Sequence, residues 1–210
     1  MKIGMMLILI VATVATGQSK FEIAIMKGKQ LLFAEGNKAE DYQNAVNYFE
    51  RVANKESEEW LPRYYQSLGT AFLALRKEQV DEKEQFLQNS LEILDQADEI
   101  EKNSETIALR GFIMMLQLSL DPATRGQTLS PIIFGKFNEA IEMNPENPRA
   151  HLFLGQMEYG TAQFFGIGFD KACELYQKSI ELYEKEQKNE NILPDWGFQT
   201  AEVSLKNCEQ

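Results

Sequence analysis

The chain carries few of the side chains that perform catalysis or bind metals. It has one histidine, His151, and two cysteines, Cys173 and Cys208. A lone histidine without a partnered nucleophile or a second ligand forms neither a catalytic triad nor a metal site. Carboxylates such as Glu58 and Glu59 are adjacent in sequence and therefore point in different directions on a helix. We predict no catalytic residue, no metal site, no cofactor and no enzymatic activity.

The stretch FFGIGFD (164–170) is the most suggestive loop for ligand binding. Gly166 and Gly168 precede a helical pattern that starts near Asp170, and a glycine-rich turn before a helix can bind phosphate. A third glycine and a following Lys-Ser/Thr pair are missing, so the stretch does not match a nucleotide-binding loop. Two interpretations of its phenylalanines stay open, because they could pack against the helices or form an exposed contact patch.

Composition limits the classes of partner. The formal net charge is -11, from 21 Lys+Arg and 32 Asp+Glu. Binding to nucleic acid or to an anionic membrane needs a basic face, so the sequence argues against both. Hydrophobic residues make up 44% of the chain, which is enough for a real core.

The first residues have the layout of a secretory signal peptide. Lys2 is followed by the apolar run IGMMLILIVATVATG, which ends in small residues ahead of Gln18. We predict a signal peptide over 1–17, cleavage near Gly17, and a periplasmic or secreted protein. The alternatives are a retained anchor or a buried first helix. The remaining chain has no second apolar stretch of membrane length, so the mature form is predicted not to span a membrane.

Helical periodicity dominates the rest of the sequence. Segments such as AVNYFERVA (45–53) and ACELYQKSIELY (172–183) repeat apolar residues at three- and four-residue spacing. Prolines at 62, 148 and 194 each precede a new helical segment, where the first turn of a helix tolerates proline. No alternating pattern typical of strands is long enough to be useful, so the predicted fold class is all-α.

The residues YQSLGTAF (65–72) and HLFLGQME (151–158) resemble the first helix of the tetratricopeptide repeat (TPR) family. Ala45 and Phe49 match its second helix, and NEAIEMNPENP carries the proline that closes a repeat. Gly69, Gly111 and Gly155 recur at 42 and 44 residues, whereas a plain TPR period is about 34. We therefore expect inserts at 77–86, 121–130 and 160–170. HEAT-type repeats, whose periods are near this size, are the alternative.

The predicted architecture is a TPR-like α-solenoid of about four hairpins with a C-terminal capping helix, forming one domain over 18–210. The hairpins are expected at about 21–54, 61–100, 104–143 and 148–186, with the cap at about 194–208. The order of the 147–184 stretch, then LPDWGF, then a cysteine near the end, is similar to a group of small exported bacterial TPR proteins. That resemblance covers most of the mature chain, and it implies architecture and export without implying a mechanism.

The TPR resemblance also implies a concave groove lined by the first helix of each hairpin. The residues that it places there are Lys27, Gln30, Arg63, Gln66, Thr70, Leu73, Glu105, Phe112, Met115, Arg149, Gln156 and Tyr159. Lys27, Arg63 and Arg149 would form a cationic stripe that engages a carboxylate-bearing peptide through charge-assisted hydrogen bonds. The alternative is that these long cations are ordinary surface residues.

The two cysteines are placed near opposite ends of two helices. Cys173 lies near the start of the last hairpin's second helix, and Cys208 lies near the end of the predicted cap. If the two helices run antiparallel, these positions meet and could form a disulfide that closes the cap onto the stack. The alternative is two ordinary small apolar residues.

These observations predict a non-catalytic exported scaffold that holds a protein or peptide partner in its concave groove. One alternative is a structural subunit of a cell-envelope complex that uses its convex or end surface. Another alternative is a small-ligand binder at the Phe164–Phe169 insert.

Overall fold

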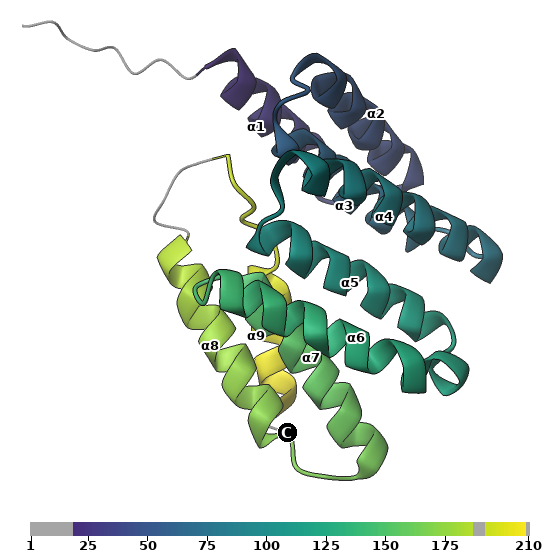
Figure 1. Ribbon diagram of the computed structural model, residues 1–210, viewed down its shortest axis with the longest axis vertical. Coiled ribbons are helices and arrows are strands. Elements are labelled where there is room, and N and C mark those ends of the chain that lie inside the picture. The colour runs from purple at the N-terminus through teal and green to yellow at the C-terminus, as the bar shows by residue number, and fades with distance from the viewer. Residues whose placement is uncertain (1–18, 187–191, 209–210) are drawn as a thin grey trace, which may run out of the picture.

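The computed structural model describes residues 19–186 and 192–208, and the predicted signal peptide (1–17) lies outside the described residues. The described residues form nine helices and no strand, so the all-α prediction is confirmed. Consecutive helices pack as four hairpins that stack along the molecule (Figure 1). The helices are α1 (Lys20–Leu32), α2 (Ala39–Lys55), α3 (Trp60–Ala74), α4 (Val80–Glu101), α5 (Ser104–Leu120), α6 (Pro122–Met143), α7 (Pro148–Phe165), α8 (Asp170–Glu186) and α9 (Phe198–Cys208).

Asparagine caps start the first helices of the last two hairpins. The side chain of Asn103 accepts hydrogen bonds from the backbone N–H groups of Glu105 and Thr106 at 3.0 and 3.1 Å. Asn147 caps α7 in the same way, and its amide also donates to Ser104 Oγ at 2.9 Å. Each cap contributes about 1 kcal/mol of helix stability. The Asn-Pro joint therefore fixes where one hairpin ends and how the next one docks.

Glycines set the close approach of the two helices in a hairpin. A Cβ atom at Gly155 would lie 2.8 Å from the ring of Tyr176, and one at Gly28 would collide with the ring of Phe49. In both hairpins the glycine stands 21 residues before the aromatic residue that covers it. Gly28 therefore sets the register of the first hairpin, for which the predicted repeat pattern has no glycine.

The long repeat period is taken up mostly by longer helices. Two of the predicted inserts, 77–86 and 121–130, lie largely within α4 and α6, which have 22 residues each. At 1.5 Å per residue such a helix extends about 33 Å. α6 continues through Pro131. The residues expected as inserts at these two places are therefore mostly helical and lie within the hairpins.

The cap differs from its prediction in where it begins. The predicted helix starts at residue 194, whereas α9 begins at Phe198 and residues 192–197 are not helical. Pro194 and Gly197, whose φ is 109°, interrupt the helix in this stretch. α9 packs against α8, and a disulfide joins Cys173 to Cys208 with the two Cα atoms 5.8 Å apart. In the described part of the chain, no helix combines the length and apolarity needed to cross a membrane.

Candidate functional site

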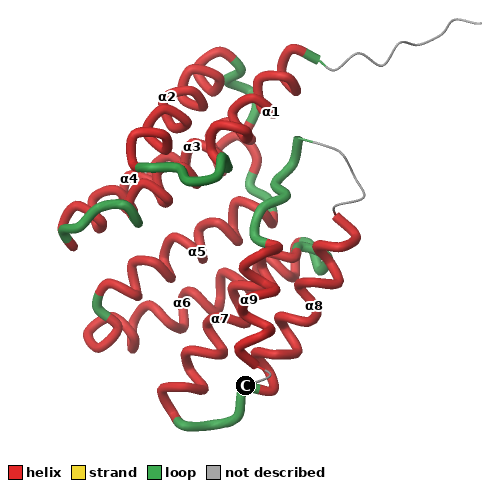
Figure 2. The backbone as a smooth tube through the Cα atoms, turned by 180° about the vertical axis from the view of Figure 1, so that it is seen from behind, coloured by secondary structure: helices red, strands yellow, loops and turns green. Residues whose placement is uncertain are grey.

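The predicted groove lies on the face formed by α1, α3, α5 and α7, which we call the groove face. A segment of the chain itself, residues 192–197, occupies it, and we call this stretch the groove segment. Figure 2 shows the groove segment as the loop that leads into α9. The amine of Lys29 donates to the carbonyl of Leu193 at 3.1 Å and forms an ion pair with Asp195 at 2.8 Å. The hydroxyl of Tyr65 donates to the carbonyl of Ile192 at 3.3 Å.

Trp196 anchors the groove segment among aromatic side chains of three helices. Its ring centroid lies 5.7 Å from those of Phe112 and Phe153, and 6.1 Å from that of Phe72. The indole N–H donates to the hydroxyl of Tyr64 at 2.9 Å. Aromatic pairs of this kind contribute about 0.5–1.5 kcal/mol each beyond the area that they bury. Trp196 is therefore the strongest single contact between the segment and the groove face.

A buried charge cluster lies beside Trp196. The guanidinium of Arg149 is 1% exposed and donates to both oxygens of Glu105, at 2.7 and 2.8 Å. Arg149 also forms an ion pair with Glu186 at 2.5 Å and donates to the carbonyl of Trp196 at 3.2 Å. One guanidinium thus connects α5, α7, the end of α8 and the groove segment.

Burial shifts the pKa of several groups around this cluster. Burial raises the pKa of Glu186 even though Arg149 acts in the opposite direction. Burial lowers the pKa of Arg149, but Glu105, Tyr183 and Glu186 together outweigh this effect and hold the pKa above its ordinary value. Burial also raises the pKa of Tyr64 and Tyr65. The cluster therefore holds a permanent cation between the carboxylates of Glu105 and Glu186.

The predicted cationic stripe is not a free surface for a peptide. The charge of Arg149 is neutralised by the chain's own carboxylates. Arg63 donates to the side chains of Gln66 and Asn54, both at 2.8 Å. Lys27 is exposed and lies over the ring of Tyr48 on α2, 5.7 Å from its centroid.

The cation of α1 that reaches the groove segment is Lys29. It follows Gly28, the residue that sets the helix register, whereas the predicted repeat pattern selects Lys27 and Gln30. Gln30 is exposed, and within the described part of the chain no hydrogen bond or ion pair joins it to the groove segment. The spacing between Gly28 and Phe49, which Gly155 and Tyr176 repeat, is the sequence signal that corrects this register.

The other predicted groove residues are divided between the core and the rim. Phe112 contacts Trp196 directly, and its ring stacks on Phe153 with centroids 4.6 Å apart. Thr70 is buried and donates to the carbonyl of Gln66 at 2.8 Å. Leu73 is buried on α3, Met115 is half-buried on α5, and Gln156 and Tyr159 are half-buried on α7.

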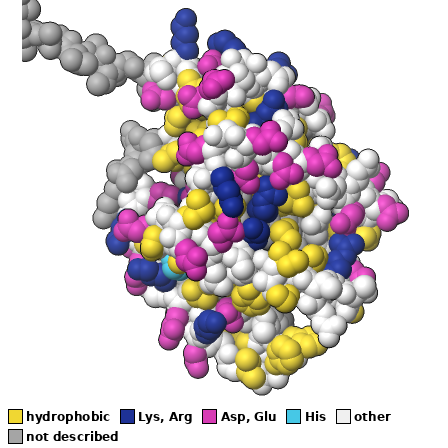
Figure 3. Space-filling view, in the orientation of Figure 1, with side chains coloured by type: hydrophobic (Ala, Val, Ile, Leu, Met, Phe, Trp, Pro, Cys, Tyr) yellow, Lys and Arg dark blue, Asp and Glu magenta, His cyan; other side chains and the backbone are white. Residues whose placement is uncertain are grey.

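The turn between α7 and α8 presents the most exposed aromatic surface of the described residues. Phe164, Phe165 and Ile167 are 82, 69 and 60% exposed. Gly166 ends α7 in the left-handed conformation with a φ of 65°. Figure 3 shows hydrophobic side chains gathered at the lower tip of the molecule, where Figure 1 places this turn. Of the two interpretations of the FFGIGFD stretch, an exposed patch describes Phe164 and Phe165.

The third aromatic residue of the turn is packed instead. The ring of Phe169 stacks on that of Tyr159, with centroids 4.5 Å apart and planes 20° apart. Tyr159 belongs to α7 and Phe169 directly precedes α8, so the stack joins the two helices beneath the turn. The exposed side chains of Phe164 and Phe165 therefore lie next to a packed aromatic pair that joins α7 to α8.

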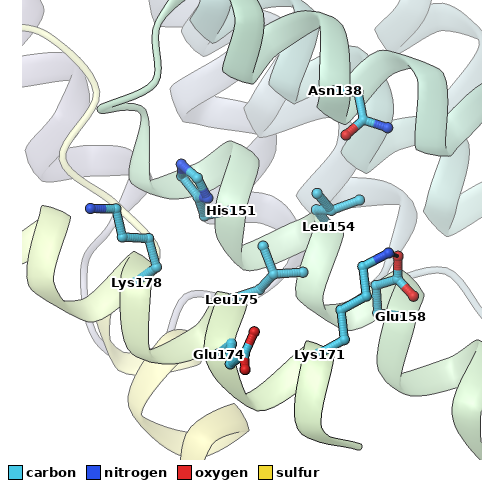
Figure 4. Close-up of a pocket in the computed structure, with 8 residues that line it drawn as sticks. All are labelled: Asn138, His151, Leu154, Glu158, Lys171, Glu174, Leu175 and Lys178. Atoms are coloured by element: carbon cyan, nitrogen blue, oxygen red, sulfur yellow. Dashed lines mark ion pairs between the residues drawn. The ribbon is translucent and has the colours of Figure 1, made fainter.

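A pocket of about 330 Å³ lies between α6, α7 and α8 and contains His151 (Figure 4). The His151 Nε2 atom lies 2.9 Å from the carbonyl oxygen of Pro145, so Nε2 carries the hydrogen. Burial lowers the pKa of His151, so the ring is neutral at neutral pH. At the rim, Lys171 and Glu158 form an ion pair at 2.6 Å. The described lining contains no serine or cysteine that this histidine could activate.

Metal ligands are not clustered in the part of the chain that the structure describes. No group of three or more His, Cys, Asp or Glu side chains is placed to hold an ion there. Both cysteines are in the disulfide. The described arrangement therefore offers binding surfaces rather than a metal centre.

Comparison with known proteins identifies similar structures. No protein-family model matches the chain, and no curated protein matches it. The HusA haemophore from Porphyromonas gingivalis is 26% identical, with 92% of this chain and 94% of that chain covered and a TM-score of 0.78. TTC0263, a thermophilic TPR protein in Thermus thermophilus, is 12% identical, with 90% of each chain covered and a TM-score of 0.59. The predicted TPR-like α-solenoid is thereby confirmed.

Of the residues that hold the groove segment, Arg149 and Phe112 belong to the set predicted from the sequence, and others lie outside it. Lys29, Tyr64, Tyr65 and Trp196 are not among the predicted groove residues. The sequence pattern assigns Trp196 to the capping helix, although Pro194 and Gly197 flank it and both disfavour a helix. That pair is the signal for an extended segment that carries a large aromatic side chain.

Proposed function

We propose that this protein binds haem or a closely related porphyrin and carries it without chemical change. The observation that carries this proposal is the similarity to the HusA haemophore along nearly the full length of both chains. Haem is a flat apolar macrocycle with two anionic propionates, so its binding surface must offer exposed apolar side chains. The α7–α8 turn meets this requirement better than the groove face, which the chain itself covers.

The exposed pair Phe164 and Phe165 would contact the face of the macrocycle. Their rings meet edge to face with centroids 5.0 Å apart, so together they present a bent aromatic surface. Full burial of a phenylalanine is worth about 1.5–3 kcal/mol, and both side chains have most of that burial still available. The Tyr159–Phe169 stack would support this surface from below.

Charge would contribute little to the affinity. The chain carries a formal net charge of -11, which opposes the propionates. Lys171 is close to the turn in sequence and its side chain is 70% exposed, but Glu158 already neutralises it. The proposal therefore expects apolar contact to dominate, and added salt to leave the affinity unchanged or to increase it.

Titration with haem, followed by the Soret absorbance, tests the proposal. We expect one haem per chain, and we expect metal-free protoporphyrin IX to bind within about tenfold of the same affinity, because the contact is to the macrocycle. The double variant F164S/F165S should bind at least about tenfold more weakly, since it loses most of that apolar contact.

A matched control uses an exposed apolar residue elsewhere. Ile132 on α6 is 48% exposed, and I132S should bind haem like the unmodified protein. If F164S/F165S binds as tightly as I132S, haem does not bind at the turn. If the unmodified protein takes up neither ligand at micromolar concentration, haem carriage is wrong.

We also propose that the chain is exported and cleaved near Gly17. The support is the basic start, the apolar run and the small residues of the first 17 positions, together with a disulfide that an oxidising compartment would preserve. Mass spectrometry of the intact protein from a producing cell tests this. A mature chain that begins at Gln18 is expected, and a chain that retains Met1 or Lys2 would contradict export by cleavage.

A second function, the binding of a peptide or protein partner by the groove face, is supported by a different observation. The groove face already holds an extended stretch of chain through hydrogen bonds to its carbonyl groups. A partner captured from the cell-envelope fraction should lose at least about tenfold in affinity for K29M, because Lys29 makes one of these hydrogen bonds and also an ion pair with the segment. If instead I132S releases the partner and K29M retains it, the outer surface is the interface, as expected of a structural subunit in an envelope complex.

A further inference from the structure

We infer that the groove face is a binding site for an extended segment of a partner protein that carries an acidic residue directly before a tryptophan, and that residues 192–197 occupy this site in cis. This inference rests on the second function proposed above and is independent of haem binding. It names the chemistry of the partner by using the contacts of the chain's own segment as a template.

The contacts divide into general ones and specific ones. The carbonyls of Ile192, Leu193 and Trp196 accept hydrogen bonds from Tyr65, Lys29 and Arg149, and any extended peptide offers such carbonyls. This pattern resembles the way peptide-recognition domains hold a main chain while pockets select side chains.

Two side chains of the segment supply the specificity. The carboxylate of Asp195 pairs with Lys29 at 2.8 Å. The indole of Trp196 sits among Phe72, Phe112 and Phe153 and donates to Tyr64. A partner needs both an anion and an indole at adjacent positions to reproduce these contacts. The partner chemistry is therefore an Asp-Trp or Glu-Trp pair in an extended stretch.

The groove segment is held less firmly than the helices on which it lies. Leu193 is 48% exposed, and the carboxylate of Asp195 is 55% exposed, so the ion pair with Lys29 is partly screened by water. Most of the packing that holds the segment comes from Trp196, among Phe72, Phe112 and Phe153. Removing that indole is therefore expected to release the segment from the groove face without unfolding the four hairpins.

Covalent attachment favours the segment over a partner. A tethered segment acts at an effective concentration of about millimolar, so a free peptide competes poorly with an intact one. Weakening the segment in cis should therefore expose the site, even though the groove face itself is unchanged.

The test measures binding of a fluorescent peptide with the sequence of residues 192–198, ILPDWGF, by anisotropy. We expect W196A to bind this peptide at least about tenfold more tightly than the unmodified protein, because the indole site becomes vacant. The peptide with Trp replaced by Ala should bind W196A at least about tenfold more weakly than the parent peptide. D195K provides a second way to loosen the segment, by reversing the charge that pairs with Lys29.

Trp60 is the other tryptophan of the chain and provides a matched control. It packs edge-on against Tyr64 at the start of α3 and is not part of the groove segment. W60A should bind the peptide no better than the unmodified protein does. Far-UV circular dichroism and the melting temperature establish that each variant is folded. The inference is overturned if W196A and D195K are folded and neither gains affinity for the peptide.

Selection of random peptides on W196A separates this inference from the broader function. Binders enriched in an acidic residue followed by tryptophan would support it. Binders of another chemistry would overturn the inference and leave peptide binding by the groove face in place, whereas a selection that yields no binder would overturn both. Dimers of the unmodified chain that the ILPDWGF peptide dissolves would overturn the partner assignment, since a second copy would then donate the segment.

Discussion

The groove face and the α7–α8 turn carry aromatic side chains in opposite states. On the groove face, Phe112 and Phe153 are buried beneath Trp196, and the charge of Arg149 is matched by two carboxylates. At the turn, Phe164 and Phe165 contact each other and are otherwise open to solvent. Cations at the expected positions of a repeat can therefore serve the fold, while exposed apolar side chains are the better indicator of a free binding surface.

The largest expected effect comes from removing the buried cation. Arg149→Met keeps a long side chain but leaves the half-buried carboxylates of Glu105 and Glu186 without a counter-charge, which should cost about 3 kcal/mol of unfolding free energy. Arg63→Met removes hydrogen bonds near the surface and should cost at most about 1 kcal/mol. Urea denaturation of both variants measures the contrast. Equal losses would mean that the cluster is open to water and that the groove face is not closed.

A pair of phenylalanine variants compares the two regions directly. Phe112→Ala should cost about 3 kcal/mol, because it opens a cavity between Phe153 and Trp196. Phe164→Ala should change stability by less than about 0.5 kcal/mol, since its ring is 82% exposed. Thermal and urea unfolding give both values. A cost at Phe164 comparable to that at Phe112 would show that the turn is packed in solution and would remove it as a ligand surface.

The buried tyrosines of α3 and α8 make stability fall at alkaline pH. Burial raises the pKa of Tyr64, Tyr65 and Tyr183, whereas the unfolded chain ionises them near the ordinary value of 10.0. Groups with a raised folded pKa stabilise the protein fully below the unfolded pKa, and this contribution is lost as pH rises through the folded pKa. Above pH 10, each such tyrosine should lower the free energy of unfolding by about 1.4 kcal/mol per pH unit.

Tyr183→Phe provides the control for the alkaline effect, because it removes one ionisable group and keeps the ring. Its unfolding free energy should fall less steeply above pH 10 than that of the unmodified protein. Urea denaturation at intervals of half a pH unit measures both slopes. Identical slopes would indicate that Tyr183 ionises freely in the folded state.

Much of the architecture follows from local sequence signals. The Leu-Gly pairs at 68–69 and 154–155, together with the Asn-Pro joint at 147–148, predict the TPR-like solenoid, because these residues fix helix approach and helix starts. The register of the first hairpin is not predicted correctly, since Gly28 follows a methionine and a lysine and lacks the leucine that precedes Gly69 and Gly155. A local sequence pattern therefore identifies a repeat unit only where the residues beside its glycine also match the family pattern.

The site could be predicted less well, for a physical reason. The pairing of Arg149 with Glu105 and Glu186 joins residues 44 and 37 positions apart, and Trp196 reaches Tyr64 across 132 positions. No spacing rule within one helix encodes such contacts. The exposed state of Phe164 and Phe165 was similarly undecided by sequence, because the same residues would suit a packed insert.

The smallest expected effect distinguishes the two carboxylates of the cluster. Burial raises the pKa of Glu186 above its ordinary value of 4.5, so ionised Glu186 opposes folding relative to its protonated form. The stability that its raised pKa contributes is present below about pH 4.5 and is lost as pH rises through the folded pKa. Glu186→Gln removes this loss of stability. At pH 8 the unfolding free energy of the variant should lie within about 1 kcal/mol of that of the unmodified protein. Between pH 4.5 and pH 8 it should rise relative to that of the unmodified protein. Glu105→Gln breaks the bidentate pair with Arg149 and should cost more at pH 8. If Glu186→Gln proves the more damaging of the two, Glu186 is the principal partner of Arg149, and the end of α8 rather than α5 fixes the guanidinium beneath the groove segment.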